Sequence, residues 1–241
     1  MTTITFNREC LKAVAPFVST EETRYYLNGV YIADGLLVAT DGHRLAVIRP
    51  KELDGAAREG FILSKETVKK ILGVKPDKKE VLYVRLDPEN KLAEVVSLFG
   101  AGSIEEASTV KGQFILASFP FTPVDGDFPP WKRLFPPTAE YEPTPAGGVG
   151  KPQTFNAKYL AAFQSFGMWV RLFLNANTNA PCVVRGETDD FDAVGLLMSC
   201  RGDSGEGEIY PAWLGLDPSR SPPVRAKEPT EGGIRTTEEE G

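Results

Sequence analysis

The segment Thr5–Leu11, with the sequence TFNRECL, returns as TFNAKYL at Thr154–Leu160, and FILSKETV at Phe61–Val68 is a looser copy. In each copy, an apolar strand end meets Asn or Ser, whose side chain can cap the first free amides of a helix. Apolar residues then follow at helical spacing, as at Leu11 and Val14. A repeat of this kind predicts an architecture built from copies of one small unit.

Three strand-like runs follow each predicted helix. They lie at 25–32, 36–39 and 44–48, at 80–86, 92–98 and 113–118, and at 168–175, 182–185 and 193–200. The repeated unit is therefore one helix followed by about three strands, used three times. One helix packed on an antiparallel sheet in each unit predicts an α+β layer architecture.

Composition divides the chain into four regions. Residues 1–137 hold two units and predict one domain, while residues 138–153 are rich in Pro and Gly and predict a linker. Residues 154–202 hold the third unit and predict a second folded part. Residues 203–241 are acidic and rich in proline, so we expect a mostly disordered tail. This tail carries −5 of the net charge of −6, which leaves the rest of the chain nearly neutral.

Residue types that serve catalysis or metal binding are scarce. The single histidine, His43, and three widely spaced cysteines exclude a multi-histidine or cysteine-rich metal site. No nucleophile motif and no phosphate-binding glycine loop accompanies His43. We therefore expect no enzyme, no metal and no cofactor. The odd number of cysteines and the absence of a signal pattern or a long apolar run predict a cytoplasmic protein.

Basic side chains gather on the polar sides of the predicted helices. They are Arg8 and Lys12 in the first helix, Lys65, Lys69 and Lys70 in the second, and Lys158 in the third. Residues four apart, such as Lys65 and Lys69, share one side of a helix. Such a side is either merely solvated or directed at phosphates, which lysine binds without regard to base sequence.

Two stretches in the first unit carry a denser pattern. RYYLNG occupies residues 24–29, and VATDGHRLAV occupies residues 38–47. Asp41-Gly42 between two apolar runs predicts a hairpin turn, since glycine accepts a positive φ. The turn alone does not explain why His43 and Arg44 stand beside it.

These two stretches resemble the middle domain of the bacterial sliding clamp, the beta subunit of DNA polymerase III. Phe61–Leu72 resembles the second strand–helix unit of that family, and Asp127–Pro136, DFPPWKRLFP, resembles the segment that closes its middle domain. Phe155–Phe163 and Leu196–Arg201 are similar to the second half of the last domain. The matching segments occur in the family's order.

The resemblance implies a ring of repeated half-units around duplex DNA, with helices lining the hole and sheets forming the rim. It implies a DNA polymerase processivity factor in replication, without a reaction of its own, that assembles with copies of itself. The implied partners are duplex DNA, bound without sequence specificity, and short peptides of polymerases and clamp loaders. A membrane is not implied. We expect a bacterial, phage or prophage protein in the cytoplasm.

The resemblance also implies site residues. A hydrophobic peptide pocket would use Leu27, Thr40, Gly42, His43, Arg44, Leu45, Pro129, Arg133, Leu134, Leu197, Met198 and Arg201. Tyr25 and Tyr26 match positions at which the family touches template DNA, where aromatic faces stack on bases. With the adjacent Arg24, they join the basic residues of the three helices in the predicted DNA-binding set.

The chain also departs from the family. The family's first domain and the first half of its last domain have no counterpart, and three half-units is an odd number for a ring of whole domains. Two hypotheses follow. One is a processivity factor that encircles DNA as an oligomer. The other is a clamp-derived adaptor or decoy that binds the same peptides without encircling DNA.

Overall fold

A computed structural model describes residues 3–55, 59–75, 80–97, 103–109, 114–137, 153–175, 177 and 179–200. The predicted linker, except Gln153, and the predicted tail lie outside these residues. Within the described residues, no helix is long and apolar enough to cross a membrane.

The first unit contains β1 (Ile4–Asn7), α1 (Arg8–Val14), β2 (Gly29–Ala33), β3 (Leu36–Thr40), β4 (Arg44–Pro50) and the short β5 (Leu53–Asp54). Two 3-10 turns, Ala15–Phe17 and Tyr25–Leu27, lie between α1 and β2. The prediction of a strand from residue 25 is therefore wrong over its first residues. There the N–H groups of Leu27 and Asn28 bond the carbonyls of Arg24 and Tyr25 in a tight turn.

The second unit contains β6 (Phe61–Ser64), α2 (Lys65–Gly73), β7 (Leu82–Asp87), β8 (Leu92–Ser97), α3 (Ile104–Thr109) and β9 (Ile115–Pro120). Helix α3 was not predicted. A 3-10 turn at Trp131–Leu134 follows. The third unit contains α4 (Ala157–Ala161), a 3-10 turn (Ala162–Phe166), β10 (Val170–Phe173), β11 (Cys182–Glu187) and β12 (Phe191–Leu197).

The capping prediction is confirmed in all three units. The side-chain oxygens of Asn7, Ser64 and Asn156 accept the N–H groups of Glu9, Thr67 and Lys158 at 2.9, 3.3 and 2.9 Å. These bonds satisfy amides that lack a partner in the first turn of each helix. The repeated Asn or Ser therefore marks the start of each helix.

The first two units are joined because they exchange strands. β1, which precedes α1, pairs with β7, which follows α2, so that Phe6 lies opposite Val84. In return β6, which precedes α2, pairs with β2, which follows α1, and Leu63 lies opposite Val30. The result is two sheets, a five-stranded one with the order β5-β1-β7-β8-β9 and a seven-stranded one with the order β10-β11-β12-β4-β3-β2-β6.

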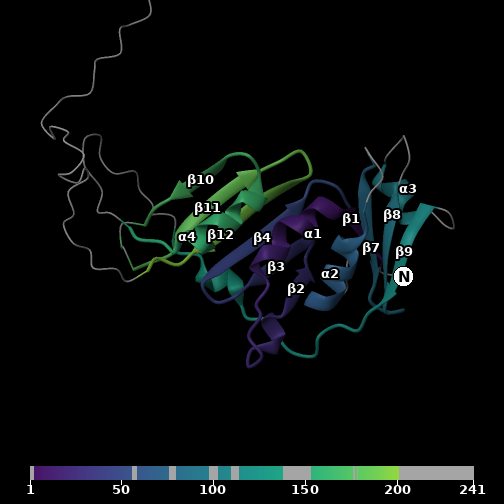
Figure 1. Ribbon diagram of the computed structural model, residues 1–241, viewed down its shortest axis with the longest axis horizontal. Helices are drawn as coiled ribbons and strands as arrows, with labels where there is room; N and C mark the ends of the chain where they lie inside the picture. Colours follow the sequence, from purple (N-terminus) through teal and green to yellow (C-terminus); the bar gives the residue numbers. More distant parts are fainter. Residues whose placement is uncertain are drawn as a thin grey trace, which may run out of the picture. The chain divides into compact units, whose positions relative to one another are not determined.

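The third unit extends the seven-stranded sheet. Its last strand, β12, pairs antiparallel with β4, and Leu196 lies opposite Leu45. Figure 1 shows β10, β11 and β12 continuing the sheet of β2, β3 and β4 on the side away from β7 and β8. The α+β layer architecture predicted from the repeat is present. The division into a domain and a half domain at residue 154 stays a prediction.

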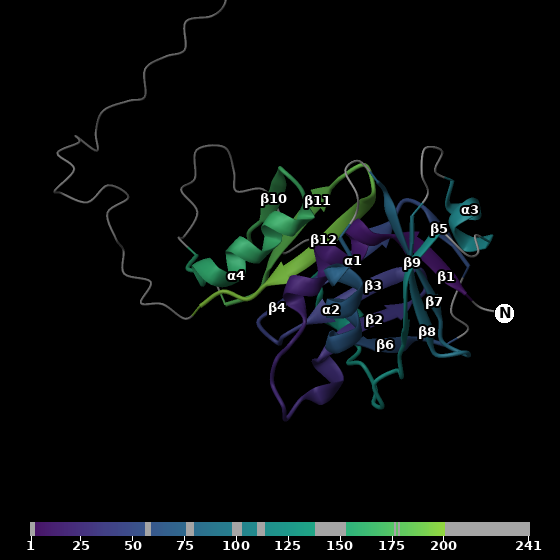
Figure 2. The same cartoon turned by 45° about the vertical axis from the view of Figure 1, so that its right-hand side comes forward.

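Helices α1 and α2 lie side by side against the sheets (Figure 2). Their apolar sides belong to one buried cluster that includes Leu11, Val14, Val68 and Ile71. Burial of such side chains contributes about 1.5–3 kcal/mol each. The polar sides of both helices consequently face away from the sheets.

Candidate functional site

Helix α2 presents a lysine surface formed by Lys65, Lys69 and Lys70. Lys69 and Lys70 are exposed and Lys65 is partly exposed, while Val68 and Ile71 are buried on the opposite side. Within the described residues, none of the three lysines has an ion-pair partner. Lys65 stands at the first position of the helix, where the positive end of the helix dipole disfavours a cation. Stability of the helix does not account for a lysine there.

Helix α1 offers less free positive charge than the sequence predicts. Arg8 is buried, and its guanidinium donates a hydrogen bond to the carbonyl oxygen of Val74, just after α2. Lys12 is exposed but forms an ion pair with Glu9 at 2.8 Å. We therefore remove Arg8 from the candidate DNA-binding residues, because its charged group holds α1 to the end of α2.

The four other members of the predicted DNA-binding set lie apart from the α2 lysines in sequence. Lys158 on α4 is exposed, and Tyr25 and Tyr26 are in contact edge to face with ring centroids 5.8 Å apart. Tyr25 is exposed. Arg24 forms an ion pair with Glu21 at 2.7 Å, and the hydrogen bond that its guanidinium donates to Glu21 raises the pKa of Arg24.

The turn between β3 and β4 is held by its own side chains. Thr40 Oγ1 accepts the N–H of Gly42 at 3.1 Å, and Asp41 Oδ1 accepts the N–H groups of His43 and Arg44 at 3.0 Å each. Gly42 has a φ of 89°, a conformation that favours glycine. The predicted Asp-Gly hairpin turn is confirmed, and it fixes where His43 and Arg44 point.

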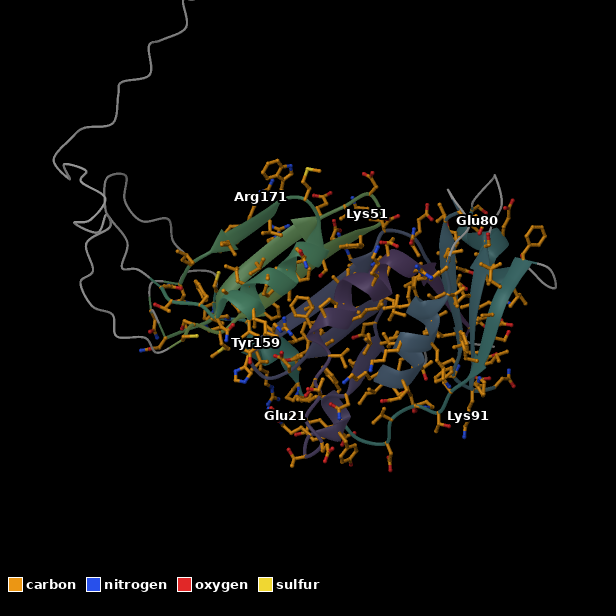
Figure 3. The ribbon with its side chains drawn as sticks, viewed as in Figure 1. Glu21, Lys51, Glu80, Lys91, Tyr159 and Arg171 are labelled. Carbon is orange, nitrogen blue, oxygen red and sulfur yellow. The ribbon has the colours of Figure 1, made fainter. Side chains whose placement is uncertain are left out.

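Arg44 and His43 both contact the third unit. The Arg44 guanidinium pairs with Asp41 at 2.9 Å and lies 5.1 Å from the centre of the Tyr159 ring. The His43 ring stacks on Tyr159 with centroids 5.1 Å apart, and His43 is exposed. Figure 3 labels Tyr159 on α4, beside the end of the sheet. The repeat contained Tyr159, but sequence reasoning did not assign it to the site.

An apolar surface lies on the face of the seven-stranded sheet that α1 does not cover. Its buried residues are Val38, Leu45, Val47 and Leu196, and the segment after β9 packs against them through Phe128, Trp131 and Phe135. Tyr31 stacks on Phe128 with centroids 4.9 Å apart. We call this set the outer apolar surface.

A cavity of about 340 Å³ opens beside the outer apolar surface. Its lining includes Tyr31, Val38, Pro129, Trp131 and Arg133. Two of the predicted pocket residues, Pro129 and Arg133, therefore lie at one cavity, while Leu45 belongs to the adjoining surface. Leu134 is exposed next to them. Aromatic and aliphatic walls with a few polar groups are typical of a site for a small ligand or an apolar peptide side chain.

Other predicted pocket residues lie elsewhere. Leu197 belongs to the buried cluster on the helix side of the sheet, and Leu196 takes the place beside Leu45. Leu27 is buried outside the cavity lining. Met198 is exposed, and its N–H donates to the carbonyl of His43 at 2.9 Å. Arg201 lies outside the described residues.

Alternation along the strands could have identified the outer apolar surface. Side chains two apart on a strand share a face of the sheet, and so do residues directly opposite each other on paired strands. Once the strands are paired, Val38 lies beside Val47 and Leu45 lies beside Leu196. The aromatic residues Phe128 and Trp131 carry no periodic signal. Their position depends on where the segment after β9 crosses the sheet.

Comparison with known proteins agrees with this geometry, although no family model matches the chain. The beta sliding clamp of Caulobacter vibrioides is 32% identical over 128 residues, which is 49% of this chain and 29% of that protein. The same match occurs in two strains. The chain thus spans less than a third of the length of these curated relatives.

Solved sliding clamps share the fold. The clamp of Bartonella birtlesii matches with a TM-score of 0.55 at 20% identity, covering 83% of this chain and 66% of that chain. The beta clamp of Helicobacter pylori matches with a TM-score of 0.56 at 12% identity, covering 84% and 67%. The DNA polymerase III beta subunit of Thermotoga maritima matches with a TM-score of 0.53 at 16% identity, covering 84% and 66%. The chain therefore has the sliding-clamp fold and resembles the bacterial beta sliding clamp, the beta subunit of DNA polymerase III, over part of that protein's length.

Proposed function

We propose that this chain is a DNA polymerase processivity factor that assembles with copies of itself around duplex DNA, without sequence preference and without a reaction or cofactor of its own. The observation that carries the proposal is the lysine surface of α2. Lys65, Lys69 and Lys70 stand on the polar side of α2, in a chain that has the sliding-clamp fold. Cations without ion-pair partners are available to bind phosphates.

Charge reversal on α2 tests the DNA contact. In the variant Lys65→Glu/Lys69→Glu/Lys70→Glu, we expect weaker binding to labelled duplex DNA. The slope of log K against log salt should fall by up to about 2.7, because each phosphate contact contributes about 0.9. Fluorescence anisotropy at several salt concentrations measures both.

The matched control is Lys51→Glu/Lys91→Glu/Lys132→Glu, which changes the net charge equally at three exposed lysines on other elements. Figure 3 labels Lys51 and Lys91, which lie away from α2. We expect the control to retain most of the salt slope. If both triple variants lose the same slope, the α2 lysines are only a solvated surface.

We further propose that the cavity beside the outer apolar surface binds short apolar peptides of replicative polymerases and clamp loaders. Its aromatic and aliphatic lining supports this, and Arg133 supplies a positive group at the cavity. His43, stacked and exposed, stands at the other end of the same sheet region beside Met198. The Arg44 guanidinium forms an ion pair with Asp41, donates a hydrogen bond to the carbonyl of Pro16 and contacts two aromatic rings. Its proposed role is therefore to hold the turn.

Substitution of exposed residues tests the peptide site without disturbing the core. Arg133→Ala/Leu134→Asp should weaken binding of a fluorescent clamp-binding peptide about tenfold or more, because the positive group at the cavity is removed and the exposed apolar residue next to it is replaced by a charge. Val81→Asp/Leu116→Asp, at exposed apolar residues on and beside the five-stranded sheet, is the control and should bind as the unmodified chain does. Equal affinity of all three proteins would contradict the peptide site.

A second candidate is an adaptor or decoy that binds the same peptides without encircling DNA. The small amount of free positive charge on α1 favours this candidate, because Arg8 is buried and Lys12 is ion-paired. If the chain is such an adaptor or decoy, we expect that the unmodified chain binds the peptide and shows no salt-dependent binding to DNA. The two assays above therefore separate the candidates.

A further inference from the structure

Strand β10 is an edge of the seven-stranded sheet and carries apolar side chains in the open. It pairs with β11 on one side, and no strand of the described residues pairs with it on the other. All four residues from Val170 to Phe173 are exposed, with 37% of Val170 and 46% of Leu172 accessible. Figure 3 labels Arg171 on this strand. An open apolar edge favours addition of another strand.

The first two units show what covers the equivalent strand. There the first strands after the helix are β2 and β7, and Val30, Ile32, Val84 and Leu86 are buried in the core. In each case the covering strand precedes the helix of the other unit. Phe6 and Ile4 of β1 lie opposite Val84 and Leu86, and Leu63 and Phe61 of β6 lie opposite Val30 and Ile32.

Leu172 has the orientation of a core residue. It lies opposite Val184 in the sheet, and directly opposed residues of an antiparallel pair share a face. Val184 belongs to the buried cluster on the helix side. Val170, two residues away, is on the same face. These two side chains therefore correspond to the buried pairs of β2 and β7, but they have no covering strand among the described residues.

The helix of the third unit also leaves an apolar side chain exposed where the first two helices bury theirs. Leu160 stands four residues after its cap Asn156, as Leu11 does after Asn7 and Val68 after Ser64. Leu11 and Val68 are buried, whereas 36% of Leu160 is accessible. The face of the third unit that corresponds to the buried core of the first two units is thus only partly covered, as expected for half of a domain.

We infer that two copies of this chain pair through their third units. In each direction, the strand-like residues Gln153–Asn156 of one copy pair with β10 of the other, as β1 pairs with β7 and β6 with β2. The third unit holds both complementary parts, a segment that precedes the helix and an open strand that follows it. Thr154 already bridges Cys200 on one side, as β1 pairs with β5.

A second copy is the partner that this arrangement fits. The exchange between the first two units is reciprocal, so two identical third units satisfy it around a twofold axis, the commonest symmetry of oligomers. Phe155 of each copy would cover the apolar side of β10 in the other, and Leu160 would lose its exposure. The pairing deepens the proposed self-assembly by naming its interface, and it holds whether or not the chain binds DNA or peptides.

Light scattering coupled to size exclusion of the full chain at micromolar concentration tests the pairing. We expect the mass of two 26.3-kDa chains for the unmodified protein and of one chain for Val170→Lys/Leu172→Lys. Both residues are exposed, so the variant should fold, and circular dichroism checks this. Val81→Lys/Leu116→Lys, on and beside the five-stranded sheet, is the control and should remain a dimer.

Several outcomes would overturn the inference. They are a monomeric unmodified chain, a dimer that survives Val170→Lys/Leu172→Lys, and a dimer that is lost in the Val81→Lys/Leu116→Lys control. Amide hydrogen exchange adds an independent measure, because the N–H groups of β10 that point away from β11 should be protected in the unmodified protein and exposed in the monomeric variant. The peptide assay reads a separate surface, so a monomeric variant that still binds peptide leaves the proposed peptide site intact.

Discussion

Arg8 and Arg44 show that a charged side chain in this protein can serve packing. The Arg8 guanidinium donates a hydrogen bond to the carbonyl of Val74, and the Arg44 guanidinium lies over the rings of Phe17 and Tyr159. Each side chain joins segments that are far apart in the sequence. Their substitution by alanine would therefore remove contacts between elements in addition to a surface charge.

The three cysteines are expected to differ in reactivity, because two of them are buried and one is exposed. Burial raises the pKa of Cys10 to about 12 and of Cys182 to about 11, whereas Cys200 is exposed. Since the thiolate is the reactive form, Cys10 and Cys182 stay protonated and protected at pH 8. We expect a thiol reagent such as DTNB to label one cysteine rapidly in the folded protein and all three in denaturant. Rapid labelling of Cys200→Ser would contradict this.

At the scale of elements, the caps let the helices present lysines without losing their first turns. Ser64 accepts the N–H of Thr67, while Lys65 at the next position opposes the helix dipole. The cap and the buried Val68 and Ile71 offset this cost. The lysine surface of α2 therefore depends on both local capping and packing against the sheets.

Removal of this cap has a measurable effect on stability. Ser64→Ala should lower the free energy of unfolding by about 1 kcal/mol, because an amide in the first turn loses its acceptor. Urea unfolding followed by circular dichroism measures the change. Thr20→Ala, at an exposed threonine outside any helix, should have little effect. Equal stability of the two variants would show that the cap contributes nothing.

For the whole molecule, the odd number of units is the feature with the largest consequence. Two units exchange strands, while the third adds its sheet to β4 and leaves β10 without a second neighbour among the strands that the structure describes. The charge does not follow this division, because all three units lie within residues 1–202, which are almost neutral, and −5 lies beyond them. A nearly neutral body that carries lysines on one helix suits contact with DNA that is weak enough to allow sliding.

Much of the local structure could be predicted from the sequence. The repeat, the three caps and the Asp41-Gly42 turn were predicted correctly because each depends on residues only a few positions apart. Helix α3 and the 3-10 turn at Tyr25–Leu27 were missed, since their patterns are short and weakly periodic. Of the residues that line the cavity, Pro129 and Arg133 belong to the predicted pocket set, while Tyr31 and Trp131 do not.

By itself, the sequence determined the unit, its helix starts and its α+β class, because capping and hydrophobic period act over a few residues. Only the tertiary structure decided that β1 and β6 exchange between units, that Arg8 is buried, and that Leu196 rather than Leu197 lies beside Leu45. These features depend on which distant strands pair and in what register. A shift of one residue in register exchanges the two faces of a strand, and no local pattern fixes it when both faces are apolar.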